Sequence, residues 1–532
     1  MINPDTDLIL LKVPINIDNS NQINFANATA QYNYFNSLPK IEGYGFTYQR
    51  KDGIIRFDAE LDEIIEYNYC MYKNDNYSDK WFYAYIESME YANDEMTYIK
   101  IKTDVYQTWQ FDIDIKPCFV EREHVNNDTI GLHTVPEQLE TGEYINNKAL
   151  LDFTYDESCY ICIATTEPIE TSDHRPGSQS TYNRIYSGLV YNIVKTAVDA
   201  NYIIDYLDDE GRGEIINSLF IVPSIMCPNA SMAKKSFTYG SINVDYYWLT
   251  SPNSGTDFGN MAIVRPTKIG NNYTPKNNKL FTFPYYYFNI TNNCGTTVTY
   301  QYENFSNIDG ISFNVQGALG AGCSIRAIPA NYKGVTSNYE EGINGAKLPI
   351  CSWSSDVYTN WLTQNSINNA VSIGTSALQL VGGIGLMATG AGGVAGASMI
   401  AGGSLGIASS IGQIYEHSFT ANQASGNTNN ADVIFAMGKS DFTCYYMSIK
   451  DEYAKIIDGY FSMFGYKVSE LKIPNTTGRR NWNYVKTIDC NIEAYIPQND
   501  LLEIKDMFNK GFTIWHNPQT FLDYSQTNDI VA

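Results

Sequence analysis

Short runs of apolar and aromatic residues, separated by polar turns, fill residues 1–150. Three such runs are KWFYAYIESM at 80–89, MTYIKIKTDVYQTW at 96–109 and FDIDIKPCFV at 111–120. A period of two indicates a sheet with one packed and one wet face, because successive side chains of a strand point to opposite sides. The third run alternates in this way, with Phe111, Ile113 and Ile115 against Asp112, Asp114 and Lys116. We predict strands here, with both aspartates on the wet face.

A second β-rich domain is expected at residues 151–350. Strand-like runs occur at 280–291 (LFTFPYYYFNIT) and 296–305 (TTVTYQYENF), and polar stretches such as 270–279 (GNNYTPKNNK) are expected to be loops. Strands punctuated by polar turns are typical of β domains.

Residues 185–207 depart from the strand pattern. Apolar residues recur there at helical spacing, among them Leu189, Ile193 and Ala197. This spacing predicts a helix.

The sequence NDLLEIKDMFNKGFTIWH at 499–516 predicts a helix followed by a strand. Asp500 is expected to be the N-cap, with Glu503 three residues later, and Gly511 is expected to end the helix. Its apolar face comprises Leu501, Ile504 and Phe508. We expect the last hundred residues to form an α+β module that shares a domain with the N-terminal part.

The composition changes sharply between Asp356 and Glu416, where no Asp, Glu, Lys or Arg occurs. Residues 371–412 hold twelve of the 39 glycines. A transmembrane helix needs about 20 mainly apolar residues, so this segment is long enough for two short spans with a bend near 390–393. We predict a helical hairpin that inserts into a membrane through these apolar residues: Leu378, Leu380, Val381, Ile384, Leu386, Met387, Val394, Met399, Ile400, Leu405 and Ile407.

Two structural alternatives exist for this glycine-rich segment. Flexible linkers are usually polar, which disfavours a spacer. A buried, tightly packed helix pair stays open, because Gly392 with Gly396 and Gly402 with Gly406 give spacings that let helices approach closely in lipid or in protein.

Net charge excludes one class of function. The chain carries 58 acidic and 35 basic residues, a formal charge of −23. A protein that binds DNA tightly needs the opposite balance. The acidic charge is explained either by solubility or by a wall past which a polyanion slides without sticking, and both explanations exclude a protein that clamps DNA.

The ten cysteines and the N-terminus indicate synthesis in a reducing cytoplasm. The start, MINPDTDLILL, lacks the features of a signal peptide. Cys159 and Cys162 form one C-x-x-C inside a strand-like run, which places their side chains on opposite faces, and no second pair completes a zinc site. We expect free, buried thiols.

Each standard catalytic or cofactor motif fails at a particular residue. MGKS at 437–440 lacks the glycine of a phosphate loop, since Val433 stands there, and GIGLMA at 383–388 lacks the acidic residue about 20 positions later. The run EREHV at 121–125 is expected to be a salt-bridged strand or its exposed edge, and NDNYSD at 74–79 a turn rather than a Ca²⁺ loop.

The spacing of the histidines does not indicate a metal site. The five are His124, His133, His174, His417 and His516, and no two stand at the i, i+4 spacing of paired metal ligands on a helix. We therefore expect no catalytic, cofactor or metal site and no enzymatic activity.

Six runs stand out at the two ends of the chain: QYNYFNS from Gln31, KWFYAYI from Lys80, DVYQTWQFDI from Asp104, VEREHV from Val120, RRNWNYVKTIDC from Arg479 and NDLLEIKDMFNKGFTIWH from Asn499. These runs resemble the tail knob, or distal tail tube, proteins of small short-tailed bacteriophages (podophages) of Gram-positive hosts. The resemblance covers roughly the first 145 and the last 100 residues, and residues 151–350 match poorly.

The resemblance implies a structural protein of the virion tail, mainly β (α+β), synthesised in the host cytoplasm and assembled as a ring. It implies a homo-hexameric tube of β-barrel-like domains below the upper tail or collar protein, which conducts the genome. It also implies that apolar loops plug the lumen and enter the host membrane on infection. The expected parts are a tube domain from 1–150 and 435–532, a β-rich knob domain at 151–350 and a hydrophobic loop region at 351–434.

Two other functions stay open at this point. A pore-forming or membrane-associated protein unrelated to virions would share the apolar hairpin. A tail-borne cell-wall hydrolase would need a cleft with paired carboxylates, and the chain has many Asp and Glu.

Overall fold

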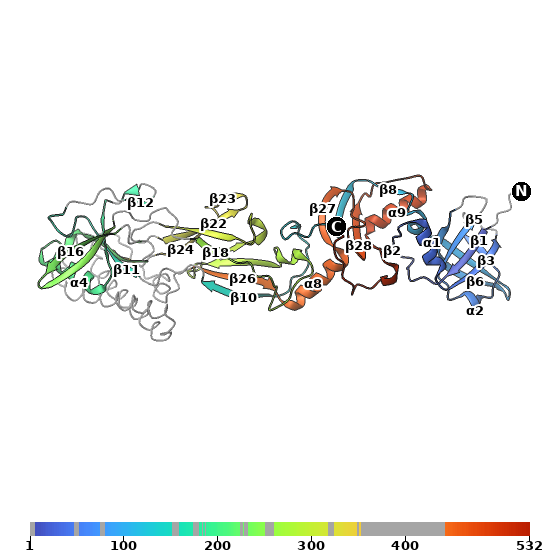
Figure 1. Ribbon diagram of the computed structural model, residues 1–532, viewed down its shortest axis with the longest axis horizontal. Coiled ribbons are helices and arrows are strands. Elements are labelled where there is room, and N and C mark those ends of the chain that lie inside the picture. Colours follow the sequence, from blue (N-terminus) through green and yellow to red (C-terminus); the bar gives the residue numbers. More distant parts are fainter. Residues whose placement is uncertain are drawn as a thin grey trace, which may run out of the picture. The chain divides into compact units, whose positions relative to one another are not determined.

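The computed structural model divides into two compact units (Figure 1). The first unit comprises Met1–Gly142, Asn272–Phe281 and Asp451–Ala532, and the second comprises Glu143–Asn271 and Thr282–Lys450. The fold is mainly β, as predicted. The structure describes residues 6–46, 53–74, 80–151, 159–173, 180–182, 185–186, 188–223, 227, 232–249, 260–317, 324–347, 350–352 and 442–531.

A six-stranded antiparallel sheet forms the N-terminal part of the first unit. Its strands, in spatial order, are β3 (Lys40–Phe46), β1 (Thr6–Leu11), β5 (Tyr69–Asn74), β6 (Phe82–Asn93), β7 (Met96–Thr103) and β4 (Ile54–Phe57). The helix α1 (Ala28–Asn36) buries Phe35 against one sheet face, and the short α2 (Leu61–Ile64) buries Ile64 against the other. The strands predicted from the runs at 80–89 and 96–103 are confirmed.

The prediction of a strand at 104–109 is wrong, because these residues form the short helix α3 (Val105–Trp109). Asp104 caps it by accepting a hydrogen bond from the Gln107 N–H at 3.0 Å. The Tyr69 hydroxyl donates to the same carboxylate at 3.0 Å. Burial raises the pKa of Asp104 to about 6, although these donors favour its charged form.

A five-stranded sheet joins residues from both ends of the chain. Its order is β2 (Asn21–Ile23), β30 (Phe512–Trp515), β28 (Trp482–Ile488), β9 (Cys118–Glu123) and β27 (Tyr466–Lys472). The β2–β30 pair is parallel and the other pairs are antiparallel. The first unit also contains the strand pair β29 (Ile492–Ala494) and β8 (Ile113–Ile115), and the helices α8 (Asp451–Phe464) and α9 (Gln498–Lys510).

The alternating run at 111–120 is confirmed only in part as regular strand. Ile113 and Ile115 of β8 pack against the hydrophobic core, but Phe111 precedes the strand and is 43% exposed. The aspartates lie on the wet side, as predicted, where Asp114 pairs with Lys116 at 2.6 Å.

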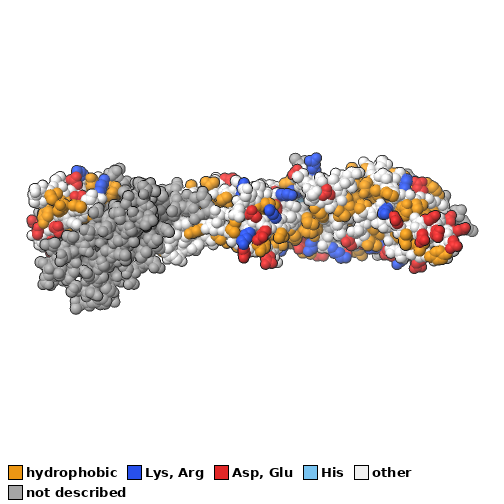
Figure 2. All heavy atoms as spheres, turned by 90° about the horizontal axis from the view of Figure 1, so that it is seen from below, with side chains coloured by type: hydrophobic (Ala, Val, Ile, Leu, Met, Phe, Trp, Pro, Cys, Tyr) orange, Lys and Arg blue, Asp and Glu red, His pale blue; other side chains and the backbone are white. Residues whose placement is uncertain are grey.

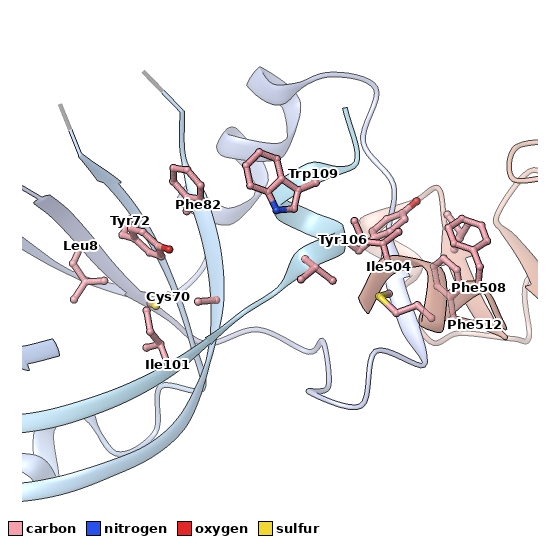
Figure 3. Close-up of a cluster of buried hydrophobic side chains, with 14 of the residues drawn as sticks. Leu8, Cys70, Tyr72, Phe82, Ile101, Tyr106, Trp109, Ile504, Phe508 and Phe512 are labelled. Atoms are coloured by element: carbon pink, nitrogen blue, oxygen red, sulfur yellow. The ribbon is translucent and has the colours of Figure 1, made fainter. Parts of the chain in front are cut away.

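One hydrophobic core fills the space between the two sheets of the first unit (Figure 3). The six-stranded sheet contributes Leu8, Cys70, Tyr72, Phe82 and Ile101, while α3 contributes Tyr106 and Trp109. From the C-terminal side come Ile504 and Phe508 of α9 and Phe512 of β30. Each fully buried aliphatic or aromatic side chain contributes about 1.5 to 3 kcal/mol, so this core binds the two ends of the chain together.

The helix and strand predicted at 499–516 are confirmed, but the predicted N-cap is wrong. Pro497 occupies the N-cap position of α9, and Asp500 lies in the first turn, where it accepts a hydrogen bond from Trp109 Nε1 at 2.7 Å. Glu503 pairs with Lys102 at 2.8 Å instead of reaching back to a cap. Gly511 ends the helix with φ of 86°, a conformation that favours glycine.

The second unit contains three larger sheets. A six-stranded sheet has the order β16 (Met232–Tyr239), β17 (Ile242–Leu249), β14 (Val190–Val194), β11 (Cys159–Thr165), β15 (Ile216–Pro223), β25 (Ile350–Ser352). A four-stranded sheet has the order β10 (Tyr144–Leu151), β26 (Thr443–Ile449), β19 (Tyr286–Thr291), β20 (Thr297–Tyr300). In the third, β18 (Asn260–Ile263), β21 (Ile311–Gly317), β22 (Ser324–Tyr332) and β23 (Val335–Ser337) follow in order, and β24 (Ile343–Lys347) also pairs with β22.

The prediction of one helix over 185–207 is wrong for its first half. Residues 190–194 form β14, and the helix α4 (Ala197–Asp209) begins only after the N-cap Thr196. All five residues of β14 are buried and only Asn192 is polar, so no period of two marks it as a strand. Its β-branched residues favour the extended backbone.

Candidate functional site

The predicted membrane-inserting segment lies outside the described residues, within 353–441. This holds for all of its apolar residues from Leu378 to Ile407 and for its four paired glycines from Gly392 to Gly406. It also holds for the motifs GIGLMA and MGKS. Among the helices that the structure describes, none combines the length and apolarity that a membrane span requires.

The charged run at 121–125 is a salt-bridged strand, as predicted, and it lies inside the sheet instead of at an edge. Glu121 pairs with Lys486 of the neighbouring β28 at 2.9 Å, Arg122 with Glu137, and Glu123 with Lys472 of β27. Paired carboxylates of this kind are structural, because their charges are already neutralised by specific partners.

A buried carboxylate on α8 fixes a loop that is distant in sequence. Asp458 is 1% exposed, and its Oδ2 accepts hydrogen bonds from the Tyr273 hydroxyl at 2.6 Å and the Lys276 N–H at 2.7 Å. Its Oδ1 accepts from the backbone and side-chain amides of Asn277 at 3.0 and 2.8 Å. Four donors from residues 272–281 therefore converge on one carboxylate.

Two further carboxylates hold the same loop. Asp128 accepts hydrogen bonds from the Asn278 N–H at 2.9 Å and the Tyr466 hydroxyl at 2.6 Å. Glu137 is shared by Lys279 and Arg122, all three being buried. We call Asp128, Glu137 and Asp458, with the residues of 272–281 that they bind, the buried clasp. Burial lowers the pKa of Lys279 against the effect of Glu137, and it raises the pKa of Asp128.

Sequence reasoning missed the buried clasp and treated 270–279 as an ordinary polar loop. One local signal existed: Asp458 stands on the apolar face of α8, with the buried Ala454, Ile457 and Phe461. A carboxylate on an apolar helix face needs partners, because a buried unpaired charge is too costly. The identity of those partners could not be read from the sequence.

Acid should destabilise the first unit through two buried histidines. Burial, with the charges of Arg479 and Arg122, lowers the pKa of His124 from 6.5 to about 3, and burial lowers that of His516 to about 4. Both rings are neutral when folded, whereas unfolded histidines take up protons near pH 6.5, so stability is full above that pH and is lost as pH falls. Each histidine should lower the free energy of unfolding by about 2 kcal/mol at pH 5.

The raised pKa of Asp104 has the opposite effect, because as pH falls the folded state takes up this proton before the unfolded state does. At pH 5 it offsets about 1 kcal/mol of the stability that the histidines remove. We expect the free energy of unfolding from urea titrations to be about 2 to 3 kcal/mol lower at pH 5 than at pH 7. His124→Asn should reduce this loss, because an amide can replace the ring's hydrogen bonds to Tyr484 N–H and the Ser462 carbonyl. Equal losses in both proteins would contradict the role of His124.

Seven cysteines are seen as free thiols, as predicted: Cys70, Cys118, Cys162, Cys227, Cys294, Cys444 and Cys490. Most are buried, including Cys162 of the C-x-x-C, while Cys294 is half-buried. Among the described residues, no group of three or more His, Cys, Asp or Glu could hold a metal ion. Of NDNYSD only Asn74 is described, and its side chain donates to Thr6 Oγ1 at 3.0 Å.

An exposed apolar row crosses the five-stranded sheet on its solvent face. Leu471 of β27 and Ile488 of β28 are both register partners of Phe119 on β9, so the three side chains stand side by side on one face. They are 76%, 48% and 39% exposed, and Ile473, two residues after Leu471, is 59% exposed. Figure 2 shows exposed hydrophobic side chains in patches among charges of both signs. Large exposed apolar patches are often sites of contact with another molecule, so this row is a candidate contact surface.

Comparisons with known proteins agree on one family. Residues 251–529 match the family described as Bacillus phage phi29 tail knob protein gp9, C-terminal domain, and residues 5–115 match the caudoviral major tail protein N-terminus. The tail knob proteins gp9 of Bacillus phages phi29 and B103 are each 25% identical, over 98% of this chain and 98% of their own length.

The fold is also that of a solved tail knob protein. The structure of the bacteriophage C1 tail knob protein, gp12, superposes with a TM-score of 0.66 at 14% identity, covering 99% of this chain and 100% of that one. The C-terminal family match alone spans more than half of the chain. The chain therefore belongs to the phage tail knob proteins, structural components of the virion tail.

Proposed function

We propose that six copies of this tail knob protein close into a ring below the upper tail or collar protein and form the distal conduit for DNA ejection. In this proposal residues 1–150 and 435–532 build the tube and residues 151–350 the knob. The apolar segment 371–412 plugs the lumen and inserts into the host membrane on infection.

The exposed apolar row is the observation that supports self-assembly. Leu471, Phe119 and Ile488 lie on the sheet that joins both ends of the chain, and neighbouring charges on that face, such as Glu121 with Lys486, are already paired within the chain. The buried centres of contacts between copies of one chain are more apolar than the rest of the protein surface. In a closed ring every copy forms the same contacts with its two neighbours, so no copy leaves its contact surface exposed.

We expect Leu471→Asp to prevent ring formation without unfolding the chain. The side chain is 76% exposed, so the substitution leaves the core intact but places a charge in the apolar row. The measurement is particle mass by light scattering together with electron micrographs, in which the unmodified protein should give six-fold rings or short tubes.

Val264→Asp is the matched control, because Val264 is 72% exposed in the second unit and far from the row in sequence. If the Leu471→Asp protein still forms rings, the exposed apolar row is not part of the contact between copies. A protein that stays monomeric without any substitution would refute the ring itself.

The charge supports passage of DNA without binding. A net charge of −23 per chain multiplies around a ring, and like charges keep duplex DNA from adhering to the walls. We expect no binding above background in an anisotropy titration with duplex DNA at physiological salt. Saturable, salt-sensitive binding in the micromolar range would contradict this.

The family match bears on the two alternative functions that the sequence left open. Membership of the tail knob family excludes a protein unrelated to virions. Wall hydrolysis has no particular observation in its favour, since the buried carboxylates of the described β9 region and buried clasp are occupied by structural partners. Release of sugars or peptides from purified cell walls would overturn this assignment.

A further inference from the structure

A surface pocket in the second unit combines aromatic and amide side chains. It is lined by residues of β19 and of the segment just before it, of the end of β20, of the 3₁₀ turn η5 (Tyr302–Asn304) and of the turn between β22 and β23. Figure 1 labels β22 and β23. Its volume of about 490 Å³ falls within the range of roughly 300 to 1,000 Å³ typical of ligand pockets.

The aromatic wall of this pocket is held in place before any ligand arrives. Phe283 is 43% exposed, and its backbone N–H donates to Glu303 Oε1 at 3.0 Å. The Tyr287 ring lies 5.6 Å from the Phe283 ring, tilted by 59°, and the buried Tyr332 also lines the pocket. These rings offer an apolar surface with polar hydroxyls at its margin.

The lining of the pocket also includes a pre-arranged pair of amides, Gln301 and Asn304. Asn304 Nδ2 donates to Gln301 Oε1 at 3.0 Å, so half of each amide is already used. Within the part of the chain that the structure describes, no hydrogen bond is formed by Gln301 Nε2 or Asn304 Oδ1. A donor and an acceptor therefore stand next to each other, which suits adjacent hydroxyl groups, since each hydroxyl can both donate and accept.

The positive charge of Lys333, which lines the pocket, is neutralised by another residue of the same chain. Lys333 forms an ion pair with Glu341, and its ammonium group lies 5.3 Å from the centre of the Tyr332 ring. Little positive charge is left to attract a phosphate or a nucleic-acid backbone. A neutral ligand with an apolar face and a hydroxyl-rich edge fits these three features together.

We propose that this pocket binds a neutral pyranose sugar of a cell-surface glycan. The ring's C–H face packs on Phe283 and Tyr287, and two adjacent hydroxyls bond to Gln301 and Asn304. The pocket volume matches a short saccharide, and a virion tail component meets the cell surface. This function goes beyond the conduit and membrane roles and depends on neither of them.

The first test is saturation-transfer NMR of the full chain with methyl glucoside, methyl galactoside and methyl N-acetylglucosaminide. At least one sugar should bind saturably, with a dissociation constant on the order of 1 mM. Phe283→Ala and Gln301→Ala should each weaken binding at least tenfold. Tyr339→Ala is the matched control, because Tyr339 is a 51% exposed aromatic residue of the same unit that does not line the pocket. Thermal unfolding of each variant verifies its fold.

The second test separates a cell-surface glycan from a free sugar. The protein should co-sediment with purified, protein-free Bacillus cell walls, and the sugar preferred in NMR should compete. Sugar binding without wall binding would overturn the glycan assignment. The pocket assignment fails if none of the three sugars binds saturably, or if folded Phe283→Ala and Gln301→Ala bind as the unmodified protein does. Preferential binding of an oligothymidylate would reassign the pocket to a nucleobase.

Discussion

A protein that lacks residues 371–412, with the ends joined by a short polar linker, is expected to assemble normally and to lose all membrane activity. The segment contains no charged residue, so it offers no ion pairs to a subunit contact, and its glycines contribute little packing area. In lipid it can satisfy its backbone hydrogen bonds internally as helices that cross about 30 Å of hydrocarbon. Dye release from liposomes under mild acid or heat measures the activity.

A milder variant should behave like the deletion. Leu386→Asp with Ile400→Asp places two carboxylates in the segment, and each costs about 2.5 to 3.5 kcal/mol at the centre of a membrane helix. Ring integrity is followed in parallel by micrography. Full leakage from intact deletion rings would refute the membrane role, whereas collapse of the rings would show that the segment belongs to the structural core.

The second large effect is expected from Asp458→Ala in the buried clasp. The substitution leaves two backbone N–H groups, the Asn277 amide and the Tyr273 hydroxyl without their shared acceptor. Loss of a buried, charged acceptor of several hydrogen bonds costs about 3 to 5 kcal/mol. Urea unfolding of the first unit should shift by this amount, and protease should cleave within residues 272–281 sooner.

Glu452→Ala is the matched control for this experiment. Glu452 is an acidic residue of the same helix α8, but it is exposed. Its removal should change the free energy of unfolding by no more than about 0.5 kcal/mol. If Asp458→Ala and Glu452→Ala have the same small effect, the buried clasp does not stabilise the first unit.

Local patterns predicted much of the fold. The strands β6, β7, β11 and β30 and the helix α9 were expected in place, because each carries its own apolar period or terminating glycine. The predictions failed where burial hid the period. In β14 both faces are buried, and at Asp104 a buried carboxylate starts the helix α3 inside what looked like a continuous strand.

The candidate sites divide in the same way. The charged run at 121–125 could be predicted as salt-bridged, because oppositely charged residues within one strand need partners on its neighbours. Asp500 was assigned as a helix cap from its spacing to Glu503, but its hydrogen-bond partner is Trp109, 391 residues away. The exposed apolar row escaped notice because Phe119, Leu471 and Ile488 are separate, ordinary residues until the strand register aligns them.

The sequence by itself determined the β-rich fold class, the family resemblance, the acidic charge and the apolar segment, because these follow from composition and short-range periodicity. Only the tertiary structure decided that the loop at 270–279 belongs with α8 and that residues 21–23 pair with 513–515. Tertiary structure also brought Phe283, Gln301 and Tyr332 together at one pocket. The physical reason is that these contacts depend on distances in space. A hydrogen bond to a buried carboxylate, or a pocket lined by several segments, forms only when chain segments far apart in sequence pack against each other and exclude water.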